Sequence, residues 1–410
     1  MKAINSTKFI VVLLFFCSTI FTSCKQEKRH VENEEPTEKM SISDTLKWSE
    51  RMALTLMKHH PEAYQIDDKT EPKWDYVHGL VLTSFEALYK KTNDQAYFDY
   101  IKNYADATID SLGTIPSYKF ENFNIDMIEA GNVLFYLYDK TKEEKYLKAM
   151  QLLRKQLEEH PRTSEGGFWH KKIYPSQMWL DGLYMGSPFY TKYTVIFENG
   201  RNLDDVAKQF ELIQKHARDE KTGLLYHGWD ESKAMDWANK ETGTSPNFWS
   251  RSLGWYAMAL VDVLDYFPKD HPKQSELVSY LNQLATALTK QQHESGLWYQ
   301  VTDMGDREGN YLEATGSAMF AYALAKGVNK GYLPKEYMQV ANNAFDGLTR
   351  ELVKVSDEGD VIITQACAVA GLGGNPYRDG SFDYYINERK KDNDPKVTGP
   401  FILAALELDK

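Results

Sequence analysis

The feature that most constrains this chain is a long run of segments with apolar residues three and four positions apart, which is the spacing of amphipathic helices. About twelve segments show it, whereas strand signals are few and short. The segments lie at 46–60, 77–91, 95–110, 125–139, 143–158, 179–197, 203–218, 250–267, 273–291, 311–327, 335–351 and 398–409. A chain of 410 residues with this pattern must pack helix on helix, so we expect an all-α fold.

The segments are of two alternating kinds. "WDYVHGLVLTSFEALYKKTNDQAYFDYI" at 74–101 aligns with "NIDMIEAGNVLFYLYDKTKEEKYLKAM" at 124–150, and four looser copies follow. The first helix of each copy is rich in glycine and alanine, whereas the second is amphipathic with a charged face. A glycine inside a helix costs about 1 kcal/mol relative to alanine, so close helix approach in a crowded inner ring must compensate. The glycines near these helix starts are Gly79, Gly131, Gly182, Gly186, Gly254, Gly316 and Gly399.

Six inner and six outer helices make an (α/α)6 barrel, which we predict as one domain over residues 44–410. An open α-solenoid is the alternative. The repeats are too uneven in length for a regular solenoid, which stacks units of similar size.

The connections from outer to inner helices carry a glycine-rich turn followed by aromatic residues. Three of them, "SEGGFWHKK" (164–172), "TGLLYHGWDE" (222–231) and "SGLWYQVTD" (295–303), each predict a short hairpin. In such a barrel all connections of this type lie at one end, where the N-termini of the inner helices also open. We therefore expect His170, Lys171, His227, Trp229 and Trp298 to converge on one mouth.

Ionisable residues stand near the starts of the predicted inner helices, namely Asp75, His78, Asp126, Asp181, Arg251 and Glu313. Taken alone, an Asp at a helix start is most often a cap or a partner of the helix dipole. Arg251 could pair with a buried acid, and Glu313 is more often structural than catalytic. Asp181 is the most unusual, because it lies in the apolar run "QMWLDGLYMGSPFY" with no basic neighbour, and a charged acid is costly to bury.

Together these groups describe a pocket with carboxylates, histidines, a lysine, an arginine and tryptophans. Cationic side chains can hold a carboxylate through charge-assisted hydrogen bonds, and aromatic residues, 13% of the chain, can stack on a sugar ring. The net charge of −11 argues against a nucleic acid partner. The residues thus predict a glycan-active enzyme with carboxylate chemistry. They leave open an inverting hydrolase of saturated glycans, a hydration reaction at a double bond, and a non-catalytic glycan-binding protein.

The N-terminus has the pattern of a bacterial lipoprotein signal. Lys2 and Lys8 precede the apolar stretch "FIVVLLFFCSTIFTS" (9–23), which is followed by Cys24. We therefore expect residues 1–23 to be removed, Cys24 to carry a lipid, and residues 24–43 to form a polar tether, with plain secretion as the alternative. This predicts a protein anchored in the envelope of a Gram-negative bacterium, facing the periplasm or on the cell surface. The only membrane contact expected is the lipid, and the oligomeric state is left open.

Cysteine usage adds a further expectation. With Cys17 in the signal and Cys24 acylated, only Cys367 remains, so no internal disulfide is expected. The chain has no CxxC or HExxH pattern, and we predict neither a metal nor a cofactor.

Several of these motifs resemble glycoside hydrolase family 105, the unsaturated rhamnogalacturonyl hydrolases. The resemblance lies in "GGFWHKKIYPSQMWLDGLYMGSPFYTKY" (166–193), "HGWD" (227–230), "FWSRSLGWYAMALVDVL" (248–264) and "NIDMIEAGNVL" (124–134). It extends from about residue 45 to the C-terminus and is densest between 124 and 264. It implies an (α/α)6 catalytic domain. The implied substrates are polysaccharide-lyase products with a 4,5-unsaturated uronic acid at the non-reducing end, and the reaction begins by hydration of the double bond.

Carried over residue by residue, the resemblance implies that Asp181 is the general acid/base, which protonates C4 and activates the water that adds at C5. Asp126 would be the second carboxylate, which binds ring hydroxyls and helps to keep Asp181 protonated. The apolar neighbours Trp179, Leu180 and Tyr184 would also raise the pKa of Asp181. The other implied substrate-binding residues are His170, Lys171, Trp179, His227, Arg251 and Trp255.

The sugar next to the uronate is not fixed by the resemblance. Rhamnose from pectin is the default expectation, and ulvan fragments or glucuronyl side chains are alternatives. Family 88 enzymes, which cleave unsaturated glucuronyl residues from glycosaminoglycan fragments, share the fold and chemistry, but the "QMWLDGLYM" run favours family 105.

Overall fold

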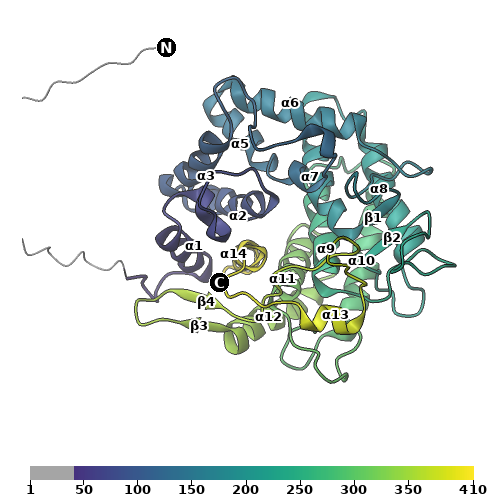
Figure 1. Cartoon of the computed structure of the whole chain (residues 1–410). Coiled ribbons are helices and arrows are strands. Elements are labelled where there is room, and N and C mark those ends of the chain that lie inside the picture. The colour runs from purple at the N-terminus through teal and green to yellow at the C-terminus, as the bar shows by residue number, and fades with distance from the viewer. Residues whose placement is uncertain (1–40) are drawn as a thin grey trace, which may run out of the picture. The chain divides into compact units, whose positions relative to one another are not determined.

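Helical hairpins form a closed ring in the structure, a computed structural model that describes residues 41–410 (Figure 1). The inner ring consists of α2 (Tyr76–Thr92), α4 (Asp126–Glu129) with α5 (Asn132–Thr141), α7 (Leu180–Phe197), α9 (Ser250–Leu264), α11 (Ala314–Asn329) and α14 (Pro395–Leu408). The outer helices are α1 (Trp48–His59), α3 (Gln95–Thr108), α6 (Glu144–Glu159), α8 (Leu203–Ala217), α10 (Gln274–Gln291) and α12 (Tyr337–Gly347). The predicted (α/α)6 barrel is confirmed.

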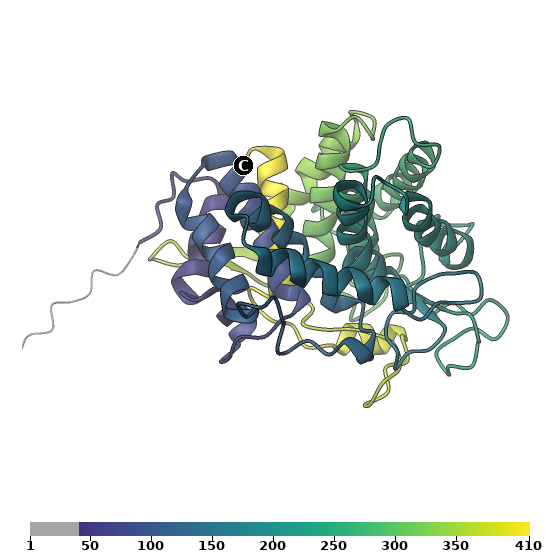
Figure 2. The same cartoon turned by 90° about the horizontal axis from the view of Figure 1, so that it is seen from above.

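The last helix of the chain closes the ring. α14 packs against α2 on one side and α11 on the other, and α1 packs against α14 from outside. In Figure 2 the yellow α14 lies between purple N-terminal helices and green helices. The other inner helices contact one another in chain order, and each of the other outer helices packs on the inner helix that precedes it.

Burial separates the two kinds of helix as their composition predicts. Nearly every residue of α9 and α11 is buried, whereas α6 and α8 each bury one stripe and expose a charged face. Glycines allow the inner helices to approach closely. A Cβ atom added to Gly79 would lie 2.4 Å from the Cα of Ala130, and one added to Gly316 would lie 2.8 Å from the Cβ of Ser250. Close approach therefore accounts for Gly79 and Gly316.

Three elements differ from the sequence expectation. The predicted helix over 125–139 is interrupted after α4, where the hydrogen bonds tighten to the i→i−3 type; a Cβ added to Gly131 there would meet Leu153 and Phe189. The predicted helix over 335–351 ends in a wide π-type turn at Leu348–Leu352. A short helix, α13 (Phe382–Asn387), was not predicted.

The strands are short and belong to the connections. β1 (Gln177–Trp179) pairs antiparallel with β2 (Gly228–Asp230), and β3 (Val353–Val355) pairs with β4 (Val361–Ile363). The first two predicted hairpins are tight turns closed by single bridges, Arg162 to Phe168 and Arg218 to Leu225. Gly166 and Gly223 turn the chain there with φ of 98° and 76°, a region that glycine enters without strain.

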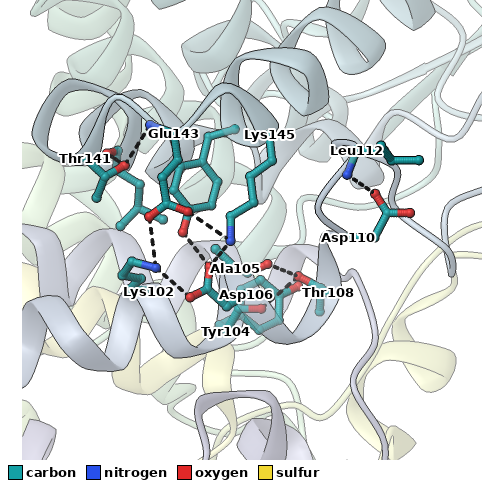
Figure 3. Close-up of polar contacts among 12 residues, drawn as sticks. Lys102, Tyr104, Ala105, Asp106, Thr108, Asp110, Leu112, Thr141, Glu143 and Lys145 are labelled. Carbon is teal, nitrogen blue, oxygen red and sulfur yellow. Dashed lines mark hydrogen bonds and ion pairs between the residues drawn. The ribbon is translucent and has the colours of Figure 1, made fainter.

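Charged side chains join neighbouring outer helices on the surface (Figure 3). Lys102 of α3 lies 2.6 Å from Asp106 and 3.1 Å from Glu143. Lys145 of α6 lies 2.7 Å from the same Asp106 and 3.1 Å from the same Glu143. Single exposed ion pairs contribute about 0–1 kcal/mol, but this closed network of four holds α3 and α6 in one register.

The predicted signal sequence, Cys24 and most of the predicted tether lie outside the described residues. Ile42, which the prediction places at the end of the tether, is buried, and its backbone N–H donates to the carbonyl of Glu358 at 2.9 Å. Among residues 41–410, no helix has both the length and the apolar character needed to cross a membrane.

Candidate active site

A short strand ladder joins two of the connections at the mouth. In the β1–β2 ladder Trp179 lies opposite Gly228, and the backbone N–H of Leu180 donates to the carbonyl of His227 at 3.0 Å. Because Leu180 is the first residue of α7, this ladder sets Asp181 beside His227.

Asp181 lies in the first turn of α7 and faces the fully buried His227. Asp181 Oδ2 is 3.1 Å from His227 Nε2, an ion-pair distance, although the two atoms are not aligned for a hydrogen bond. Within residues 41–410 the Asp181 side chain caps no helix. In contrast, Asp75 accepts from the N–H of Val77 at 3.4 Å and Glu313 from that of Gly316 at 2.6 Å. Capping is therefore not the role of Asp181 in this structure.

The electrostatic surroundings of Asp181 differ from the sequence expectation. Burial raises the pKa of Asp181, as its apolar neighbours suggested, but His227, with His170 and Arg251, outweighs burial and brings the pKa below the ordinary value. The expectation of a raised pKa is thus wrong for the protein without substrate. The direction of this pKa shift depends on His227, which lies beside Asp181 because of the β1–β2 ladder.

Asp126 is the centre of a second polar cluster. It begins α4, with Oδ2 2.6 Å from Lys171 Nζ and Oδ1 3.5 Å from His170 Nε2. Burial lowers the pKa of Lys171, but the charge of Asp126 and its hydrogen bond more than compensate, so the pKa is raised and the lysine stays charged. An antiparallel bridge between Asn124 and Lys171 holds the two segments together.

His170 lies within the electrostatic reach of both acids. Burial lowers the pKa of His170 to about 4, although Asp126 and Asp181 both act to raise it. The ring is therefore neutral near pH 7. It stacks on Trp179 with centroids 4.2 Å apart, and Tyr174 also stacks on Trp179 at 4.9 Å. These rings form an aromatic wall beside the acids.

Arg251 enters the site from the first turn of α9. It is buried over the ring of Trp249 at 4.6 Å and donates to the carbonyl of Cys367. Its charge contributes to the lowered pKa of Asp181, so it acts on the acid without forming an ion pair with it.

Trp255 lies one helical turn deeper on the same helix. It is buried, with its ring stacked on Tyr184 at 4.9 Å and edge-on to Tyr76 at 6.3 Å. The structure thus places Trp255 in the core beneath Arg251 rather than on the rim.

Trp298 and Trp229 do not line the mouth as predicted. Trp298 is fully buried between α10 and α11, where its indole N–H donates to the carbonyl of Leu288 at 2.8 Å. Trp229 stacks on His216 at 3.9 Å and donates to the carbonyl of Thr242. In both cases the aromatic side chain packs its own connection against an outer helix.

His78 and Glu313 also have structural roles. His78 is buried against Tyr104 and contacts the carbonyl of Tyr64 at 3.0 Å. Glu313 caps α11 and accepts from the backbone N–H of Cys367 at 2.9 Å, which agrees with the structural reading of this residue.

The sequence did not point to Tyr385, which the structure places beside His227. Its hydroxyl lies 2.8 Å from His227 Nδ1, and both side chains are fully buried. Tyr385 lies on α13, which is outside the repeats and too short to show a helical period. The sequence carries no signal that would have located it.

Two buried histidines make stability depend on pH. Burial lowers the pKa of both His160 and His170 to about 4 from the ordinary 6.5. Between these values the unfolded chain binds protons that the folded protein does not, so stability falls as the pH decreases from about 6.5 to 4. Each histidine accounts for up to about 3 kcal/mol. We expect calorimetry between pH 7 and 4.5 to show this fall and His160→Gln to reduce it without abolishing it, because burial lowers the pKa of His60 and His78 as well. A pH-independent midpoint would contradict the assignment.

Comparison with known proteins matches almost the whole described chain. The family model for Glycosyl Hydrolase Family 88 covers residues 48–410. A solved structure of a family 105 glycoside hydrolase from C. acetobutylicum is 46% identical, with a TM-score of 0.85, and the match covers 89% of this chain and 99% of that one. The unsaturated rhamnogalacturonyl hydrolase YesR of Bacillus subtilis is 28% identical over 272 residues, 65% of this chain and 73% of that protein. The unsaturated glucuronyl hydrolase of Bacillus sp. GL1 shares the fold, at 12% identity and a TM-score of 0.63 over 88% of this chain and 95% of that one.

Proposed function

The chain belongs to glycosyl hydrolase family 88, and on that premise we propose that it releases a 4,5-unsaturated uronic acid from the non-reducing end of polysaccharide-lyase products. It is a glycoside hydrolase by its family and by its 46% identity to a family 105 enzyme. The observation that carries the finer proposal is the arrangement of two acids beside one aromatic wall, Asp181 with His227 and Asp126 with Lys171.

We propose that Asp181 supplies the proton and receives it back. Its carboxyl protonates C4 of the unsaturated ring, which leaves an oxocarbenium ion at C5 stabilised by the ring oxygen. Water then adds at C5 and gives its proton to the Asp181 carboxylate. The resulting hemiketal opens to a ketone at C5, which leaves a hemiacetal at C1. This hemiacetal then collapses to an aldehyde and releases the aglycone as an alcohol that keeps the glycosidic oxygen. Asp181 is thus regenerated in its starting protonation state.

The lowered pKa of Asp181 in the free protein is compatible with this role because the substrate is itself an anion. A uronate bound beside Asp181 disfavours the carboxylate and raises its pKa. We therefore propose that substrate binding, rather than the apolar wall, brings Asp181 to its acid form.

The cationic and aromatic residues around the acids suit the remaining parts of the sugar. Lys171, which stays charged, and Arg251 are the proposed partners of the uronate carboxylate. Trp179 offers an indole face, and Asp126 can accept hydrogen bonds from ring hydroxyls. His170 is neutral near pH 7, so we assign it a hydrogen-bonding rather than an ionic role.

For the aglycone we propose rhamnose, with unsaturated galacturonate as the released sugar. Support comes from the 28% identical relative that is named an unsaturated rhamnogalacturonyl hydrolase. A second candidate is a glucuronyl-type fragment, as in ulvan, favoured by a 25% identical relative over 167 residues that is named an unsaturated 3S-rhamnoglycuronyl hydrolase.

An absorbance assay across pectin, ulvan and glycosaminoglycan lyase digests tests the function and the aglycone together. The conjugated double bond absorbs in the ultraviolet, so turnover removes absorbance, and we expect the fastest loss with the pectin digest. Release of saturated sugars without this loss would instead identify an inverting hydrolase. Tight binding without turnover would identify a glycan-binding protein.

We also propose that the protein is anchored through a lipid on Cys24 in the cell envelope, facing the periplasm or the cell surface. The signal pattern before Cys24 supports this. Mass spectrometry of the mature N-terminus tests it, and an N-terminus that begins elsewhere without a lipid would contradict it.

A further inference from the structure

We infer that Tyr385 is a positioning residue whose hydroxyl holds His227 in the tautomer with Nε2–H facing Asp181. The inference rests on the proposed function of Asp181. Tyr385 touches neither acid; it acts through the imidazole ring, with its hydroxyl 2.8 Å from His227 Nδ1.

The direction of this hydrogen bond follows from the surroundings of the hydroxyl. Among residues 41–410 the Tyr385 hydroxyl has no partner other than His227 Nδ1. If Nδ1 carried the proton and donated it, the buried O–H of Tyr385 would have no acceptor, at the cost of an unpaired buried donor. The hydroxyl therefore donates and Nδ1 accepts. A neutral imidazole has one proton, so it resides on Nε2, the atom 3.1 Å from Asp181 Oδ2.

The surrounding packing fixes both rings. Trp249 contacts both, with centroids 4.8 Å from the His227 ring and 5.8 Å from the Tyr385 ring. Gln300 donates to the carbonyl of Tyr385 at 3.0 Å and accepts from the indole N–H of Trp249 at 3.0 Å. The carbonyl of His227 is also held in the β1–β2 ladder, so the main chain of both residues is fixed, and a turn of the His227 ring would break its buried hydrogen bond to Tyr385.

The fixed tautomer has a chemical consequence for the proton cycle. When Asp181 has given its proton to carbon, it is a carboxylate, and the positive end of an Nε2–H group 3.1 Å from Oδ2 stabilises that anion electrostatically. The other tautomer would direct a lone pair at the carboxylate and favour the protonated acid. The other titratable or charged groups that act on Asp181, His227 or Tyr385 are His170, Arg251, Cys367, Asp379 and Tyr384, and substitution of Tyr385 by Phe leaves them all in place.

The test compares Tyr385→Phe with wild type in two measurements. Nitrogen-15 NMR of histidine-labelled protein, with the His227 signals identified from His227→Gln, should show a single Nε2–H tautomer in wild type and a mixture in Tyr385→Phe. With unsaturated uronides, kcat should fall about tenfold with KM little changed. In the plot of kcat against pH, the fall on the alkaline side should move to higher pH by about half a pH unit or more, because the Asp181 carboxylate loses the fixed N–H dipole beside it.

Tyr384→Phe is the matched control, since it removes a hydroxyl from the same helix that bonds Gly371 instead, at 3.0 Å. It should leave the His227 tautomer and the alkaline side of the kcat–pH profile as in wild type. An unchanged tautomer with an unmoved kcat–pH profile in Tyr385→Phe would overturn the inference, even if kcat fell, because a structural defect alone does that. Equal changes of the His227 tautomer and of the kcat–pH profile in Tyr385→Phe and Tyr384→Phe would overturn it too. Absence of any wild-type turnover would refute the proposed function instead, and the NMR comparison would still decide the tautomer.

Discussion

Asp181→Asn should abolish turnover of unsaturated uronides while leaving the barrel folded. An amide has nearly the shape of a carboxyl but can neither give a proton to C4 nor accept one from water. Removal of a general acid/base costs about 10²–10⁴-fold, and Asp181 is proposed for both steps, so we expect kcat to fall at least about a thousandfold. The measurement is the loss of ultraviolet absorbance with the best lyase digest, with circular dichroism to establish the fold.

Asp75→Asn is the matched control for this substitution. Asp75 also stands at the start of an inner helix, but its carboxylate caps α2 through the N–H of Val77. Asn caps a helix about as well as Asp, so activity and stability should stay near wild type. Near wild-type turnover in Asp181→Asn would show that another group supplies the proton, and the assignment of Asp181 would be wrong.

Gly79→Ala should destabilise the barrel far more than its single methyl group suggests. The added Cβ would lie 2.0 Å from Glu129 Oε2 and 2.4 Å from the Cα of Ala130. The side-chain oxygen can turn away, but the backbone at Ala130 moves only if the α4–α5 junction moves. Overpacking costs about 1–3 kcal/mol and occasionally more, and we expect the upper end, seen as a fall of about 5 °C in the unfolding midpoint. Because Asp126 begins α4, activity should fall as well.

Gly182→Ala provides the comparison for stability. It too lies near the start of an inner helix, but an added Cβ would be 3.3 Å from His170 Nδ1 and 3.6 Å from Ile125. A small shift accommodates it, and alanine gains about 1 kcal/mol of helix propensity. Its unfolding midpoint should therefore stay close to wild type. If the two variants were equally stable, close helix approach would not explain the glycine at position 79.

The fold could be predicted from the sequence because the pattern that determines it, the spacing of apolar residues, is periodic. Apolar spacing located all twelve barrel helices, and the glycines distinguished inner from outer ones. The interruption at Gly131 was not predictable, since the apolar spacing continues through it and the residues packed there, Leu153 and Phe189, belong to other helices. α13 was not predicted because six residues are too few to show a helical period.

The candidate site was predictable to the extent that topology decides it. The alternation of outer and inner helices predicted that His170, Lys171 and His227 lie at the same end of the barrel as Asp126 and Asp181. The structure brings these five residues together. The sequence could not give their electrostatics. The pKa of Asp181 depends on a contact with His227 across two strands that are each three residues long. For Trp298 the predicted place of its connection in the barrel was right, but the predicted direction of its side chain, toward the mouth, was wrong.

The place of α14 in the ring has a consequence for how this protein folds. α2 and α14 lie far apart in the sequence, yet the two pack side by side, with α1 against α14. Until residues 395–408 dock, the flanks of α2 and α11 have no partner and the ring is open. Closure therefore needs contacts between distant parts of the barrel sequence, which form slowly because the entropy of closing a long loop must be overcome first. Closure is the step of folding that the local hairpins do not assist.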